Sequence, residues 1–152
     1  MKDIGFKTAL LNHCKEIVDE KYRNLLALDK AVQSSANNET KSSAGDKYET
    51  GRAMMHLEKE RLASQMNELA KFKKPLEMIN PEKVSGIVEL GSLVITGDRN
   101  YFIAVSLGEV SLDDQTFFCI SPVTPIGKLM LGKRAGESFT FAGKSVGIKE
   151  VY

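Results

Sequence analysis

Gly45-Asp46-Lys47-Tyr48-Glu49 is the stretch around which this chain of 152 residues is organised. It closes a polar run rich in Ser and Asn that begins at Ser34, and a segment rich in Met, Leu and charged residues follows it. Ser, Asn and Gly favour turns and helix caps over helix interiors. The stretch is therefore predicted to be the turn of a helical hairpin, which carries the carboxylates of Asp46 and Glu49 at its far end.

A long amphipathic helix is predicted before this turn. Residues 6–32 contain neither Gly nor Pro, and good helix formers dominate. Their apolar residues recur in alternating steps of three and four, which is the spacing of a coiled-coil seam, with Tyr22 on its flank. The predicted seam consists of Leu11, Cys14, Val18, Leu25, Leu28 and Val32, with Lys21 as its one polar interruption.

A second helix is predicted after the turn. Gly51 weakens its start, and Pro75 and Pro81 are expected to bound its end. Two helices of similar length joined by a polar turn can bury their apolar stripes against each other as an antiparallel hairpin. Because the chain after Pro81 is too short to cover the first helix, we expect a protruding coiled coil. The apolar stripe of the second helix consists of Met54, Leu57, Leu62, Met66, Leu69 and Phe72.

The chemistry of the chain changes after Pro81, where short β-branched and aromatic runs alternate with turns that contain Gly. A polar connection is expected at residues 108–115. One short helix is expected at residues 125–131, since Pro stands near its start and Gly just past its end. An α+β fold is predicted, with an antiparallel helical hairpin over residues 1–80 and an antiparallel sheet over residues 81–152. The expected strands are residues 84–90, 93–96, 101–105, 116–120, 138–141 and 146–151.

Composition limits the classes of function. The net charge of +1 provides no bulk electrostatic attraction to nucleic acid or membrane, so a stand-alone DNA-binding domain is not expected and a protein partner is favoured. No stretch approaches the ~18 apolar residues that span a bilayer. The start of the chain lacks the apolar run of a signal peptide. We therefore expect a cytoplasmic protein that makes no membrane contact.

The two cysteines, Cys14 and Cys119, stand on elements that are predicted to be separate. With only His13 and His56 besides, no Cys/His cluster has the spacing of a zinc site. We expect two buried or half-buried, reduced and mutually isolated thiols.

The carboxylates at the turn permit two interpretations. Asp46 and Glu49 are three residues apart and lie on one face if the segment is helical. Such a pair suits Mg²⁺, which takes one or two protein carboxylates and completes its shell with water or phosphate oxygens. Acidic residues at a helix start also cap free N–H groups and complement the helix dipole. The spacing alone favours capping.

Residues 121–141, which begin Ser121-Pro-Val-Thr-Pro-Ile-Gly, resemble the C-terminal motif of the Gre transcript-cleavage factors. The resemblance extends to the strand opening Gly91-Ser-Leu-Val94. It implies an FKBP-like C-terminal domain after an antiparallel coiled coil, and it implies that this domain holds the outer rim of a channel in bacterial RNA polymerase. The matching residues are Leu129, Leu131, Gly132, Lys133, Arg134, Gly136 and Glu137. The implied polymerase-binding residues are Ser121, Pro122, Lys128, Lys133 and Arg134.

The turn resembles the Gre family as well, because Gly45, Asp46 and Glu49 match its Gly-Asp-x-x-Glu tip. The resemblance implies that the coiled coil enters the secondary channel of the polymerase. There Asp46 and Glu49 would help hold a second Mg²⁺ and a water that cleave the 3′ segment of backtracked RNA. The chain would then be a monomeric activator of the polymerase and not an enzyme. It would need no cofactor when free, and it would reach the RNA 3′ end only within the complex. DNA binding is also expected from the resemblance, although the net charge of +1 gives it no separate support.

The segment after the tip differs from the family pattern. Members continue Glu-Asn-Ala-Glu-Tyr, whereas this chain continues Glu49-Thr-Gly-Arg-Ala53, which brings the cation of Arg52 near the carboxylates. A Gre-like factor that occupies the channel and does not stimulate cleavage is therefore the main alternative. A prolyl isomerase or chaperone is a remote alternative, prompted only by the FKBP-like fold.

Overall fold

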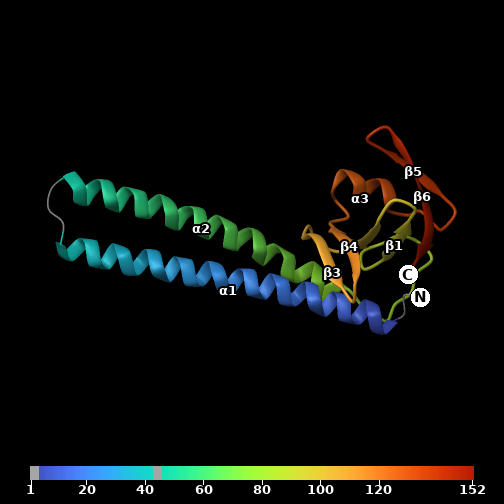
Figure 1. The fold of residues 1–152 in the computed structure, drawn as a ribbon, viewed down its shortest axis with the longest axis horizontal. Helices are drawn as coiled ribbons and strands as arrows, with labels where there is room; N and C mark the ends of the chain where they lie inside the picture. Colours follow the sequence, from blue (N-terminus) through green and yellow to red (C-terminus); the bar gives the residue numbers. More distant parts are fainter. Residues whose placement is uncertain (1–3, 43–45) are drawn as a thin grey trace. The chain divides into compact units, whose positions relative to one another are not determined.

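The structure is a computed structural model that describes residues 4–42 and 46–152, with side chains described except at Ala36 and residues 38–48. Two long helices precede a six-stranded mixed sheet and one short helix (Figure 1). The predicted α+β class is confirmed. In chain order the elements are α1 (Ile4–Ser42), α2 (Asp46–Met78), β1 (Leu93–Thr96), β2 (Asn100–Ile103), β3 (Gly108–Leu112), β4 (Gln115–Ile120), α3 (Pro125–Met130), β5 (Ser138–Phe141) and β6 (Lys144–Val151).

The chain divides into two compact units, each with its own internal contacts. One unit, called the sheet unit below, combines the described residues up to Lys15 with Lys74–Tyr152. The other, the hairpin unit, is Glu16–Lys73. The first turns of α1 therefore belong with the sheet, which differs from a simple division of the chain at residue 81.

Helix α1 is longer than the sequence predicted. It continues through the polar run to Ser42, ten residues past the expected end at Val32. Ser and Asn lower helix stability by only about 0.5 kcal/mol each, and no Gly or Pro interrupts the run before Gly45. The Gln33 amide also donates to the Asn37 side chain one turn later, at 3.2 Å. Extending the existing helix by one residue adds a backbone hydrogen bond, so continuation is favoured over termination in this run.

Helix α2 also passes a residue that was expected to stop it. Pro75 lies inside the helix, which ends at Met78. An interior Pro costs about 3 kcal/mol because it removes a hydrogen bond and crowds the preceding turn. Leu76 and Ile79, only 2% and 6% exposed, bury apolar surface around this last turn and offset that cost.

The hairpin is antiparallel, since Tyr22 meets Lys73 and Asp29 meets Lys59 across the two helices. Its seam differs from the predicted one at two positions. The seam on α1 is the set of buried or half-buried residues Val18, Tyr22, Leu25, Asp29 and Val32. Their steps of four, three, four and three keep the heptad while using Tyr22 in place of Lys21 and Asp29 in place of Leu28.

Several residues predicted to lie in the seam instead face solvent. Leu28 is 52% exposed, and on α2 Met54 and Leu57 are 66% and 63% exposed. The α2 side of the seam is formed by Met55, Leu62, Met66, Leu69 and Phe72, together with the half-buried Glu58. Apolar residues stand next to each other in both helices, so the periodicity alone did not decide which of them turned inward.

The sheet has the strand order β3-β4-β2-β1-β6-β5. Four of its pairings are antiparallel, as predicted, whereas β2 and β4 pair in parallel with Tyr101 opposite Phe118. The cause is the β3–β4 hairpin, which folds back so that β4 lies beside β2 and β3 takes the edge. Asp113 and Asp114, with φ of 50° and 60°, form its two-residue turn.

Two local predictions in this half were wrong. Residues 84–90 form no strand, and their β-type pairing is an isolated bridge between Ile87 and Arg134. Residues 108–112, expected to be a polar connection, form β3, whose alternate residue Val110 is buried. An edge strand can form with a single buried residue, but one apolar residue does not produce the alternating pattern by which strands are predicted from sequence.

The core of the sheet unit is closely packed. Its fully buried side chains include Phe102, Phe117, Leu93, Ile103 and Met130. Within the described part of the chain, no helix is both long and apolar enough to cross a membrane.

Candidate functional site

The hairpin turn is the first candidate site. Gly45 and the side chain of Asp46 lie outside the described residues, so the predicted carboxylate pair stays a prediction. The backbone is informative, since α2 begins at Asp46 and contains Glu49 one turn later. The two positions therefore share a helix face. The Glu49 side chain is exposed.

The divergent residues after Glu49 continue α2. Thr50 and Arg52 are exposed, and Gly51 is half-buried. Among the described side chains no ion pair joins Glu49 to Arg52, although both are exposed on successive turns. The Glu49 carboxylate is therefore not occupied by the neighbouring cation. Nowhere in the described ranges do three or more His, Cys, Asp or Glu side chains gather as a possible metal site.

The second candidate site is the loop that precedes α3. Thr124 caps the helix, because its Oγ1 accepts from Gly127 N–H at 3.2 Å and donates to Ser121 O at 2.7 Å. The Ser121 hydroxyl accepts from Val123 N–H at 3.3 Å. Pro125 occupies the start of the helix, where its missing N–H costs nothing. The Ser-Pro-Val-Thr-Pro sequence is thus a rigid helix cap.

Gly127 is required by this cap for a steric reason. A Cβ at residue 127 would lie 2.3 Å from Ser121 O and 2.9 Å from Thr124 Oγ1. No side chain fits at those distances without moving the backbone. The Gly of the motif therefore brings the helix start onto the Ser121 carbonyl.

The Gly132–Gly136 loop follows α3 and is held by backbone hydrogen bonds. Gly132, with φ of 80°, donates to Val88 O at 2.9 Å, and Val88 N–H donates to Lys133 O at 2.9 Å. Arg134 N–H donates to the Glu137 carboxylate at 3.3 Å. The motif that resembles the Gre family thus builds one continuous, hydrogen-bonded surface segment from residue 121 to residue 137.

The predicted polymerase-binding residues are all on this segment, but they differ in exposure. Lys128 and Arg134 are exposed, whereas Ser121, Pro122 and Lys133 are half-buried. None of the three cations takes part in an ion pair with a described side chain. Lys128 and Arg134 are therefore available to an acidic partner, while Ser121 and Pro122 shape the cap.

Sequence reasoning matched Leu129 and Leu131 to the motif, but it did not single out Val123 and did not predict that these apolar side chains are exposed. Val123 is 72% exposed, Leu129 is 38% exposed and Leu131 is 40% exposed. Exposed apolar residues beside unpaired cations are typical of surfaces that bind proteins. The sequence does contain an indication of this exposure, because Val123 stands between Pro122 and Pro125 in a predicted turn. An apolar residue there is not part of a strand or helix that would bury it. We call Val123, Lys128, Leu129, Leu131 and Arg134 the α3 surface.

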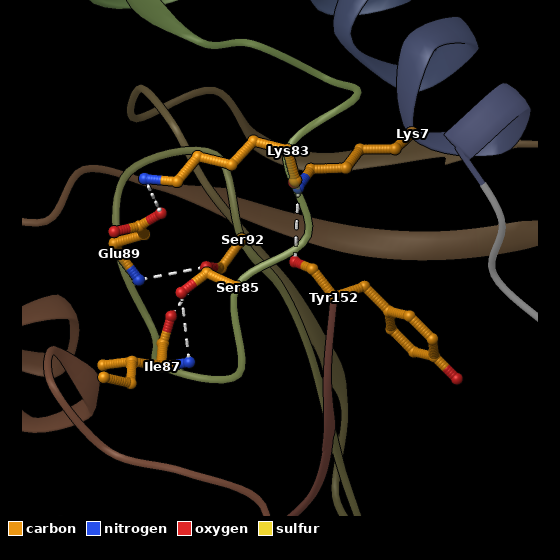
Figure 2. A network of polar contacts seen from close by, with 7 residues as sticks. All are labelled: Lys7, Lys83, Ser85, Ile87, Glu89, Ser92 and Tyr152. Carbon is orange, nitrogen blue, oxygen red and sulfur yellow. Dashed lines mark hydrogen bonds and ion pairs between the residues drawn. The ribbon is translucent and has the colours of Figure 1, made fainter.

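A polar network lies elsewhere in the sheet unit (Figure 2). Lys7 is only 4% exposed as a residue, and its Nζ donates to Lys83 O at 2.9 Å and to Tyr152 O at 3.3 Å. Burial lowers the pKa of Lys7. Lys83 pairs with Glu89 at 2.8 Å, and Ser92 Oγ accepts from Glu89 N–H at 3.0 Å. These bonds tie the first turns of α1 to the loop before β1. The adjoining cavity measures about 260 Å³.

These features define a two-unit α+β protein with an acidic residue near the turn of a helical hairpin and with exposed apolar and cationic side chains on and around α3. No family model matches the chain, and no curated protein matches it. Among solved structures it is similar to the GreA factor homolog 1 (Gfh1) protein of Thermus thermophilus, with 20% identity over 86% of this chain and 94% of that chain. The TM-score is 0.34, so the superposition is too loose to establish a family.

Proposed function

We propose that this chain is a Gre-like factor that binds bacterial RNA polymerase and stimulates cleavage of backtracked RNA. The observation that carries the proposal is the position of the Gly-Asp-x-x-Glu sequence. It falls where α1 has ended and α2 begins, with Glu49 exposed one turn into α2. Residues 46 and 49 lie one turn apart on one face of α2, so both carboxylates can approach a single Mg²⁺.

The hairpin has the dimensions for this task. From Glu16 to Ser42 the helix rises by about 40 Å at 1.5 Å per residue, which is long enough to deliver a side chain into a deep channel. The hairpin consists of only two helices, so its cross-section is small. Asp46 and Glu49 would add ligands to a Mg²⁺ that the polymerase shares, while the polymerase supplies the other metal and the rest of the site. The chain activates the polymerase and is not itself an enzyme.

The α3 surface, together with the half-buried Ser121, Pro122 and Lys133, serves in this proposal as the contact with the body of the polymerase. Its unpaired cations and exposed apolar side chains support binding to an acidic and partly apolar partner. The chain would act as a monomer in the cytoplasm, with the RNA 3′ end reached only through the complex.

The proposal is tested with backtracked elongation complexes and the purified full chain in Mg²⁺ buffer. The wild-type protein is expected to accelerate release of the 3′ RNA fragment, and the double variant Asp46→Asn with Glu49→Gln is expected to lose at least 100-fold of that effect. The matched control is Glu60→Gln with Glu68→Gln, which removes the same charge from exposed positions of α2. Equal cleavage by the wild type and the tip variant would refute a catalytic role for the two carboxylates.

A second candidate function is supported by the residues after Glu49. Thr50, the exposed Arg52 and Ala53 stand where the family tip has Asn, Glu and Tyr, so the chain would occupy the channel without promoting cleavage. This factor would compete with a cleavage-active Gre protein for the polymerase. The distinguishing measurement is cleavage by a fixed amount of that protein while this chain is added. Inhibition without cleavage supports the regulator, and an unchanged rate together with no binding excludes both candidates.

A further inference from the structure

The two cysteines of the chain meet inside the sheet unit. Cys14 on α1 and Cys119 on β4 are both fully buried, and their Sγ atoms are 3.7 Å apart. The expectation that they are reduced agrees with the structure, in which both are free. The expectation that they are isolated from each other was wrong, because a separation of 105 in residue number hides the contact.

The local folds explain why the sulfurs meet. Cys14 follows Leu10 and Leu11 on the buried face of α1, at helical spacing. Cys119 follows Phe117 by two residues, so both side chains lie on one face of β4. The rings of Phe6 and Phe117, with centroids 5.6 Å apart, fix the same pairing of α1 with β4. The register of helix on strand therefore holds the thiols in van der Waals contact.

We propose that Cys14 and Cys119 form a reversible oxidation site, at which a disulfide oxidant links α1 covalently to β4. A disulfide bond is about 2.05 Å long, so the sulfurs must approach by about 1.6 Å. Rotation about the two Cα–Cβ bonds together with a small shift of α1 supplies that movement. The site is independent of the polymerase and of the carboxylates at the hairpin turn.

The chemistry balances with oxidised glutathione as the oxidant. The thiolate of one cysteine, written here for Cys14, attacks one sulfur of the oxidant and releases one glutathione thiolate, which leaves a mixed disulfide on Cys14. The Cys119 thiolate then attacks Cys14 Sγ, forms the Cys14–Cys119 bond and releases the second glutathione. Two protein thiols lose two electrons and two protons, and the oxidant is reduced to two molecules of glutathione.

The two thiols influence each other through their contact, in which either sulfur can be the donor. The hydrogen bond between them lowers the pKa of Cys14 against the opposing effect of burial, and the same bond and burial raise the pKa of Cys119. Whichever thiolate forms first attacks the oxidant, and the other thiol completes the bridge. Because both sulfurs are covered, the oxidant reaches them only when the first turns of α1 open locally. Oxidation is therefore slow but intramolecular.

The test oxidises the reduced full chain with oxidised glutathione in native buffer and in 6 M guanidinium chloride, blocks remaining thiols and determines intact mass. In native buffer we expect a monomer that has lost two hydrogens and carries no glutathione. Tryptic digestion without reductant should join residues 8–15 to residues 100–128. In guanidinium chloride the ratio of bridged chain to glutathione adduct should fall at least tenfold, because contact no longer raises the local thiol concentration.

Two single variants are matched controls. Cys14→Ala and Cys119→Ala each leave one thiol, and neither can form the bridge, so each should give only glutathione adduct or dimer. Native wild-type protein that gives a double adduct, intermolecular dimers or the same product ratio as the unfolded chain would overturn the proposal. This outcome is read on the wild type, so it does not depend on how well the variants fold.

Discussion

The hairpin unit and the sheet unit are stabilised in different ways. Among the described side chains of the hairpin unit, only Val18 and Leu62 are buried, and the rest of the seam is half-exposed. The sheet unit buries large side chains such as Phe102 and Phe117 completely. The backbone hydrogen bonds of a helix are local, so the hairpin needs no strand pairing, and its stability depends on the limited burial along the seam. We infer that the hairpin tolerates substitution and local opening more readily than the sheet.

The largest difference is expected from truncation of buried side chains. Phe102→Ala should lower the free energy of unfolding by about 4 kcal/mol, whereas Leu62→Ala should cost about 2 kcal/mol because water reaches the thin seam. Chemical denaturation followed by circular dichroism measures both. Hydrogen exchange should show that Leu62→Ala deprotects residues 16–73 selectively. An equal or greater cost for Leu62→Ala would break the comparison between the units.

The helix cap before α3 gives the next effect. Gly127→Ala places a methyl group 2.3 Å from Ser121 O, and we expect a loss of about 3 kcal/mol from the displaced backbone. Gly147→Ala is the matched control, since no atom lies within 4 Å of a Cβ there. The readout is the denaturation midpoint of each variant. A Gly127→Ala protein as stable as the control would show that the cap is looser than its contacts indicate.

The seam of the hairpin offers a stabilising change of about 1 kcal/mol. Asp29 is half-buried in the seam and pairs with Lys59 at 3.3 Å, with side chains 30% and 35% exposed. An ion pair of that exposure contributes about 0–1 kcal/mol, less than an apolar contact at a seam position. Asp29→Leu should therefore raise the unfolding free energy, and it should also weaken the salt dependence. Asn24→Leu, at an exposed position, should not.

The smallest effect is a pH dependence at Lys7. Burial lowers its pKa in the folded protein below the usual 10.5, so the unfolded chain binds more protons between those two pKa values. Stability contributed by this group therefore rises as the pH increases through that window. The Lys7→Met variant should lack the rise. Denaturation of both proteins between pH 8 and 10.5 measures the difference, and parallel profiles would contradict it.

The sequence predicted the elements better than their packing. The hairpin, the α+β class and the strands at 93–96, 116–120 and 138–141 followed from periodicity and turn residues. Periodicity did not predict that Asp29 occupies the seam in place of Leu28, because this depends on the ion pair of Asp29 with Lys59 on the other helix. The helical Pro75 likewise depends on burial of its neighbours, which no local pattern records.

The candidate sites divide in the same way. Spacing and resemblance identified Asp46 and Glu49, but the side chain of Asp46 lies outside the described residues, so the pair stays a prediction. The α3 segment was predicted, yet exposed Val123 was missed because a lone Val in a turn has no period. The contact of Cys14 with Cys119 was unpredictable from spacing, since it joins a helix near one end of the chain to a strand near the other.

The sheet unit is discontinuous in the chain, and this makes the hairpin an insertion within it. An inserted antiparallel rod is adjustable in length, provided that equal numbers of residues are added to or removed from both helices. Removal of seven residues from each keeps the heptad phase and shortens the rod by about 10 Å. The length of the hairpin can thus change in steps of one heptad per helix, by engineering or by divergence, without any change to the residues of the sheet.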